Sequence, residues 1–123
     1  MVKQLLIVGL GGGLGSILRF LSYALTAKYY SKAFPLATFV VNILGCLLIG
    51  VLIGLLGHHI QSNHNLKLLF ITGFCGGYTT FSAFALENVT LLQSQNYWTL
   101  IIYVLLSVLL GLLAVWLGML LTK

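Results

Sequence analysis

Charged side chains are scarce in this sequence. Only 6% of its 123 residues are charged, and a single acid, Glu87, stands against six lysines and arginines. A soluble domain of this length needs a far larger polar surface. Because 60% of the residues are hydrophobic and the mean hydropathy is +1.11, the composition predicts an integral membrane protein. The basic residues are scattered, so the net charge of +5 indicates contact with membrane lipid headgroups and not with nucleic acid.

Residues that carry catalytic or metal chemistry are also few. Cys46 and Cys75 form no CxxC pair, and we interpret them as small buried apolar side chains. His58, His59 and His64 fall in a polar loop without a matching cysteine or acid, which does not favour a metal site. Since no catalytic constellation is visible, we do not expect an enzyme.

Four segments are long and apolar enough to cross a bilayer, which takes about 20 residues each. Lys28 to Pro35 forms a loop of interfacial composition between the first two, and Pro35 suits the first turn of a helix. Arg19 interrupts the first segment and no clean cleavage site follows, so we expect a retained helix and not a signal peptide. No linker divides the chain, which predicts one transmembrane channel domain over residues 1–123. The expected helices cover residues 4–27, 36–57, 66–93 and 98–121.

The loop charges give almost no orientation signal. With four helices, Lys3, Lys67 and Lys123 lie on one side of the membrane, and Lys28 and Lys32 lie on the other. The positive-inside rule needs a clear excess on one side to set the topology. We therefore predict that the chain inserts in both orientations and pairs antiparallel with itself, about a twofold axis in the membrane plane.

One basic residue lies at membrane depth. An unpaired cation at the position of Arg19 costs at least about 2.5 kcal/mol. Gly11 and Gly15 precede it at one-turn spacing, which is typical of close helix packing. Arg19 either extends its side chain to one interface or attracts anions into an aqueous vestibule.

Polar side chains in the later segments have two interpretations each. Asn42 either bonds a neighbouring helix or offers its amide to a transported species. Tyr103 and Ser107 either pack with the small residues of the last helix or line a path. Glu87 comes late in the third segment, near a vestibule, where it does not favour a proton-coupled cation exporter.

The third segment contains "GFCGGYTTFSAF" at residues 73–84. Its glycines and β-branched threonines weaken a helix, so a break is expected near residues 76–80. Carbonyls freed by a break in the membrane need partners, and together with the end of the preceding half-helix they suit a small hard cation. Phe81 and Phe84 follow on one face. They either pack as ordinary aromatics or turn positive ring edges towards an anion, with Ser82 among the available donors.

Three segments, taken in order, make the chain resemble the fluoride channels of the Fluc or CrcB type. They are "GGGLGSILRF", "NILGCLLIG" and "GFCGGYTTFSAF", and the resemblance covers nearly the whole sequence. It implies an all-α membrane protein assembled as an antiparallel, dual-topology homodimer with two fluoride pathways, each built from both subunits. It also implies a structural sodium ion at the dimer centre, held by the backbone carbonyls of Gly76 and Thr79.

The resemblance also assigns roles to side chains. Phe81 and Phe84 match the family's aromatic box, and Asn42 matches its pore-facing amide. The remaining matches are Ser82 in the polar track, Tyr103 and Ser107 in the last helix, Arg19 at the entrance and Glu87 in the vestibule. Ala83 departs from the family, which often has threonine there, so one hydroxyl of the track is missing.

The sequence thus predicts a passive, fluoride-selective channel in the inner membrane of a bacterial-type cell, exporting fluoride from the cytoplasm. Two other classes share its features. A small multidrug exporter has the same length, helix number and dual topology, and a membrane assembly subunit would transport nothing.

Overall fold

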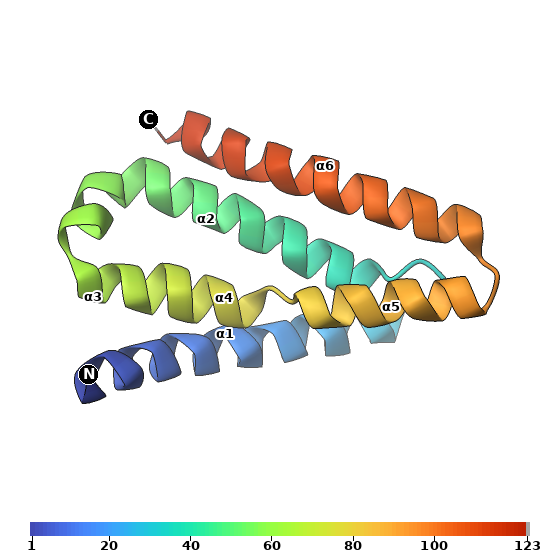
Figure 1. Ribbon diagram of the computed structural model, residues 1–123, viewed down its shortest axis with the longest axis horizontal. Helices are drawn as coiled ribbons and strands as arrows, with labels where there is room; N and C mark the ends of the chain where they lie inside the picture. Colours follow the sequence, from blue (N-terminus) through green and yellow to red (C-terminus); the bar gives the residue numbers. More distant parts are fainter. Residues whose placement is uncertain (123) are drawn as a thin grey trace.

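The computed structural model describes residues 1–122, except for the side chains of residues 60 and 61. Over these residues the chain forms helices and no strand, and four helical spans are long and apolar enough to cross a membrane. Three spans are single helices, α1 (Val2–Tyr29), α2 (Leu36–Ser62) and α6 (Tyr97–Leu121). The third span is divided into α3 (His64–Leu66), the π-helical stretch η1 (Lys67–Cys75), α4 (Gly76–Tyr78) and α5 (Phe81–Gln93). The prediction of four membrane helices with a break in the third is confirmed (Figure 1).

The second helix is longer than predicted. Its expected end at residue 57 is wrong, because α2 continues to Ser62. The polar residues after Gly57 include no proline, and the hydroxyl of Ser62 donates to the carbonyl of His58 at 2.8 Å. The turn follows at Asn63, whose side-chain oxygen accepts the amide of Asn65 at 3.1 Å and so caps the next helix.

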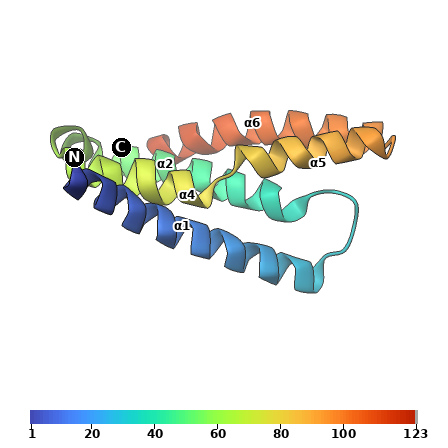
Figure 2. The same ribbon diagram turned by 60° about the horizontal axis from the view of Figure 1, so that its bottom comes forward.

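The helices pack in two pairs. α2 lies along α6, and α1 lies along η1 and α4 (Figures 1 and 2). Glycines bring both pairs close. A methyl group at Gly77 would lie 2.8 Å from the Cα of Gly12, and one at Gly118 would lie 2.7 Å from the amide nitrogen of Val51. The small residues predicted to pack helices therefore do so.

The break occupies Thr79 and Thr80 alone. Thr79 has φ −79° and ψ 160°, and Thr80 has φ −150° and ψ 119°, both in the extended region. Gly76 keeps helical angles of −63° and −37°, so the break occupies only the C-terminal end of the expected region, residues 76–80. Gly77 stays helical in close contact with Gly12 of α1, whereas β-branched threonines suit an extended backbone. After the break, α5 leaves α1 and runs beside α6 (Figure 2).

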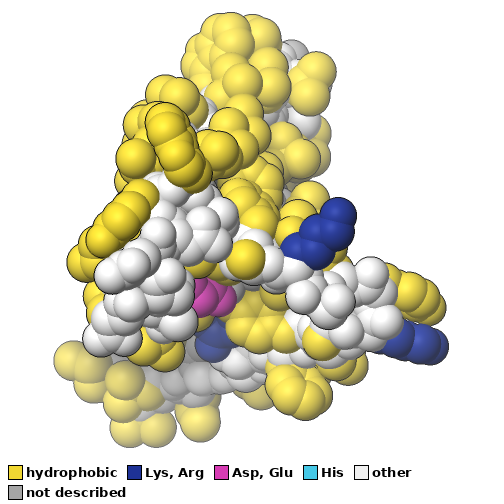
Figure 3. Space-filling model, turned by 90° about the vertical axis from the view of Figure 1, so that its right-hand side faces the viewer, with side chains coloured by type: hydrophobic (Ala, Val, Ile, Leu, Met, Phe, Trp, Pro, Cys, Tyr) yellow, Lys and Arg dark blue, Asp and Glu magenta, His cyan; other side chains and the backbone are white. Residues whose placement is uncertain are grey.

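Little of the chain is buried. Val41, Cys75, Thr38 and Tyr103 are fully enclosed, whereas many large apolar side chains are exposed, Phe20 by 70%. Hydrophobic side chains also cover much of the face in Figure 3. Such a surface suits lipid or another protein chain and not water.

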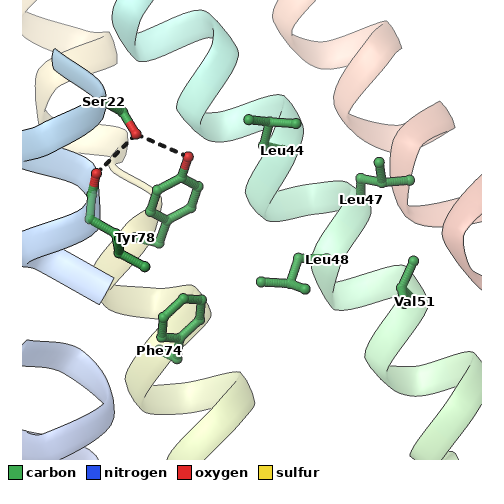
Figure 4. A pocket seen from close by; sticks show the side chains of 8 residues that line it. Ser22, Leu44, Leu47, Leu48, Val51, Phe74 and Tyr78 are labelled. Atoms are coloured by element: carbon green, nitrogen blue, oxygen red, sulfur yellow. Dashed lines mark hydrogen bonds between the residues drawn. The ribbon is translucent and has the colours of Figure 1, made fainter. Parts of the chain in front are cut away.

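An apolar groove of about 390 Å³ lies between α1 and α4 on one side and α2 on the other. Figure 4 shows Phe74 and Tyr78 across the gap from Leu44 and Leu48. The two rings are stacked with centroids 6.3 Å apart. The hydroxyl of Ser22 lies 3.3 Å from that of Tyr78 and provides the polar contact of the groove wall.

Candidate functional site

Two side chains from other helices hold the backbone of the break. The amide of Asn42 donates to the carbonyl of Thr80 at 3.0 Å, and its oxygen accepts the Thr80 N–H at 2.8 Å. Nη1 of Arg19 donates to the carbonyl of Thr79 at 3.0 Å. The carbonyls of Thr79 and Thr80, the two residues of the break, thus each accept a side-chain donor of the chain.

Arg19 and Asn42 can now be placed. Arg19 turns towards the break, and its role in attracting anions stays a prediction. Asn42 makes the predicted interhelical bond. The other interpretation, that its amide is offered to a transported species, stays open. Its amide has two N–H groups, and the bond to Thr80 uses one of them. Asn42 also lines a cavity of about 240 Å³ together with Phe81, where the second N–H could meet an anion.

The residues predicted to hold a cation differ in their present bonding. The N–H of Thr80, which would bond the Gly76 carbonyl in a continued helix, donates to Asn42 instead. Gly76 is also exposed on the surface of the chain. The Thr79 carbonyl already accepts one bond from Arg19, and a carbonyl oxygen has a second lone pair. Two carbonyls at a helix C-terminus fit a sodium ion, which such oxygens bind in broken transporter helices.

Glu87 belongs to a hydrogen-bonded cluster that joins four helices. Its Oε1 accepts the hydroxyl of Thr38 at 2.5 Å, and its Oε2 accepts that of Tyr103 at 2.7 Å. The hydroxyls of Tyr23 and Thr38 lie 2.8 Å apart. Because Thr38 gives its one proton to Glu87, Tyr23 must be the donor of that bond. The cluster fixes both oxygens of the carboxylate.

Phe81 and Phe84 lie between the break and this cluster. The ring of Phe81 is 79% exposed, and its centroid lies 5.7 Å from that of Phe84. Phe84 in turn lies 5.1 Å from the ring of Tyr103 at an angle of 57°. The hydroxyl of Ser107 is buried without a hydrogen-bond partner in the described part of the chain. Ser82 is exposed, and its hydroxyl lies 3.2 Å from that of Thr80.

Three polar residues of the site were missed from the sequence. Thr80 caps α5 by accepting the amide of Ala83 at 3.2 Å, and Thr38 and Tyr23 complete the Glu87 cluster. A signal existed for Thr38, which lies one helical turn before Asn42 and so on the same face. Tyr23 has the same signal, since it lies one helical turn after Arg19.

The sequence model of the family described as CrcB-like protein, Camphor Resistance (CrcB), matches residues 6–119. The chain belongs to this CrcB-like family. This confirms the resemblance noted from the three sequence segments, and members of the family are ion channels and not enzymes.

Relatives of this CrcB-like chain match it from end to end. A protein of Azobacteroides pseudotrichonymphae genomovar. CFP2 is 50% identical over 123 residues, covering 100% of this chain and 98% of its own length. A protein of Flavobacterium psychrophilum is 50% identical over 122 residues, covering 99% and 98%. Both are named fluoride-specific ion channel FluC. With four membrane-spanning helices and channel relatives, the chain is a multi-pass bacterial membrane protein, as predicted.

Proposed function

We propose that this chain forms a passive, fluoride-selective channel that exports fluoride from the bacterial cytoplasm. One observation supports this above the others. In a chain that aligns end to end with fluoride-specific channels, Asn42 and Phe81 line one cavity directly beside the break. That cavity offers an amide N–H and an aromatic ring, which are groups that interact with a small anion.

Selectivity would follow from the kind of groups along the path. The edge of a phenyl ring is positive and the ring resists deformation, so Phe81 and Phe84 would accept a small anion at their edges. The second N–H of Asn42 and the unpartnered hydroxyl of Ser107 would replace part of its hydration shell. Larger halides would be rejected for size. None of these side chains carries a charge, which would let the ion leave as readily as it enters.

We further propose that two copies assemble antiparallel, in dual topology, with two pathways and a sodium ion at the centre. The support is the Gly76 carbonyl, which lacks its helical donor and lies on an exposed residue. A peptide oxygen left bare in a membrane costs several kcal/mol, so a group from outside the chain must meet it. A sodium ion shared with the same carbonyls of a second copy would supply that group, and would keep the two broken helices together.

The function is tested by efflux from liposomes, measured with a fluoride electrode. The purified protein should release fluoride from potassium-loaded vesicles when valinomycin is added, without any imposed proton gradient. A small multidrug exporter would instead couple an organic cation to protons, and an assembly subunit would move neither. Proton-coupled cation transport with no fluoride release would overturn the proposal.

The assembly is tested separately in cells. Reporters fused to the chain terminus should be active on both sides of the membrane, because the lysine count of the loops is nearly balanced. A single orientation would refute the antiparallel dimer without bearing on fluoride conduction.

A further inference from the structure

A cavity of about 310 Å³ opens where the α1–α2 loop meets α5. The loop contributes Lys32, Phe34 and Pro35, and α5 contributes Glu87 and Thr90. Figure 3 looks onto this end of the molecule, where the acidic side chain lies in a hollow and basic side chains project around it. We call this cavity the mouth. Glu87 forms part of its wall.

Glu87 alone would repel an anion from this mouth. It is the one acid of the chain, and both its oxygens accept hydroxyl protons, as an ionised carboxylate does. Its hydrogen bonds come from Thr38 and Tyr103 and not from a basic side chain, so its charge is not neutralised by a direct ion pair. A positive charge must face the same cavity if fluoride is to collect there.

Lys32 is the basic residue among those that line the cavity. It lies on the exposed loop, four residues before α2 begins at Leu36. We propose that Lys32 offsets the charge of Glu87 and draws fluoride into this mouth, so that it sets the apparent affinity of the channel. This inference rests on the proposed function.

Side-chain contacts link the mouth to the residues of the proposed path. Glu87 is bonded to Tyr103, and Tyr103 lies against the ring of Phe84. An anion gathered beside Glu87 is therefore separated from the aromatic residues by one hydrogen-bonded side chain. The concentration of fluoride in the mouth then sets the rate at which ions reach those rings.

The effect of Lys32 should be modest and dependent on salt. A unit charge at about 7 Å in a water-like dielectric changes the local concentration of a monovalent ion roughly threefold. Such an attraction extends over about 30 Å at 0.01 M ionic strength and over about 3 Å at 1 M. Removing the charge should thus reduce flux when salt and fluoride are both low, and should have little effect otherwise.

Lys28 provides a matched control. It has the same charge, lies four residues earlier at the end of α1, and does not line the cavity. Its ammonium group lies 5.4 Å from the ring centroid of Tyr29. The substitutions Lys32→Gln and Lys28→Gln remove the same charge from neighbouring positions, and Lys32→Arg keeps the charge in the mouth.

The experiment measures initial fluoride efflux from liposomes at several fluoride concentrations, in about 0.01 M and about 0.5 M potassium glutamate. We expect Lys32→Gln to raise the half-saturating fluoride concentration about threefold in low salt, with the maximal rate unchanged and the difference lost in high salt. Lys32→Arg should match the unmodified protein, and Lys28→Gln, which removes a charge from outside the cavity, should have a smaller effect than Lys32→Gln. Equal behaviour of Lys32→Gln and Lys28→Gln in low salt would overturn the inference while leaving the proposed function standing. If the unmodified protein releases no fluoride, both proposals fail.

Discussion

The double hydrogen bond between Asn42 and Thr80 can be removed by one substitution. Asn42→Ala deletes the donor to the Thr80 carbonyl and the acceptor for its N–H, which are 3.0 and 2.8 Å away. Thr80 is only 9% exposed, so little water is available to replace either bond. The break would then lose its main attachment to α2.

The magnitude follows from the groups left behind. A buried polar group without a partner costs about 1–3 kcal/mol. The cavity of about 240 Å³ beside Asn42 lets some relaxation occur, so we expect a total loss of roughly 2–3 kcal/mol for the two bonds. For a chain of this size that corresponds to a fall of about 10 °C in the unfolding midpoint. Fluoride flux should fall at least about tenfold, because an N–H of the path is lost and the break can move.

Thermal unfolding in detergent and liposome efflux measure the two effects. Cys46→Ala is the matched control, since Cys46 lines the same cavity but makes no bond to the break. Asn42→Asp extends the test, because it preserves the shape and the acceptor but places an oxygen against the Thr80 carbonyl. We expect it to impair flux as well. If Asn42→Ala unfolds at the same temperature as Cys46→Ala and conducts fluoride at the normal rate, Asn42 does not hold the break.

Two further substitutions test the packing and the path. Gly77→Ala should destabilise the protein by about 1–3 kcal/mol, because the new methyl group would lie 2.8 Å from the Cα of Gly12. Gly13→Ala is its control, with nothing within 4 Å of the added atom, and equal unfolding midpoints for the two would contradict close α1–α4 packing. Phe81→Ile should abolish most fluoride flux yet leave the unfolding midpoint nearly unchanged, since the ring is 79% exposed and contributes little to the packing of the chain. Normal flux in this variant would remove Phe81 from the path.

The main features of the fold were predictable because hydropathy alone defines membrane helices. The four spans and the presence of a break follow from apolar runs, glycines and threonines. The approximate position of the break, near residues 76–80, follows as well, but its extent does not, since helix propensities measured in water count Gly76 and Gly77 as helix breakers. In the folded chain Gly77 approaches Gly12 closely and stays helical, and the break is confined to Thr79 and Thr80. The π-helical stretch η1 has no sequence signal that we can identify.

The candidate site was predictable in part. Asn42, Glu87 and Tyr103 stand out because polar groups are rare in apolar segments. Their partners depend on which helices meet in space. Thr38 shares a helix face with Asn42, but its bond to Glu87 depends on the packing of α2 near α5. The sodium ion, the antiparallel dimer and the two pathways stay predictions, since they concern groups outside a single chain.

Halide selectivity in reconstituted vesicles tests the central claim most directly. Efflux is started by adding valinomycin to liposomes loaded with equal concentrations of potassium fluoride and potassium chloride. Each anion is followed with its own electrode. The proposed path of ring edges and a few uncharged donors predicts rapid fluoride release while chloride stays inside. Release of both anions at similar rates, or of neither, would contradict a fluoride-selective channel.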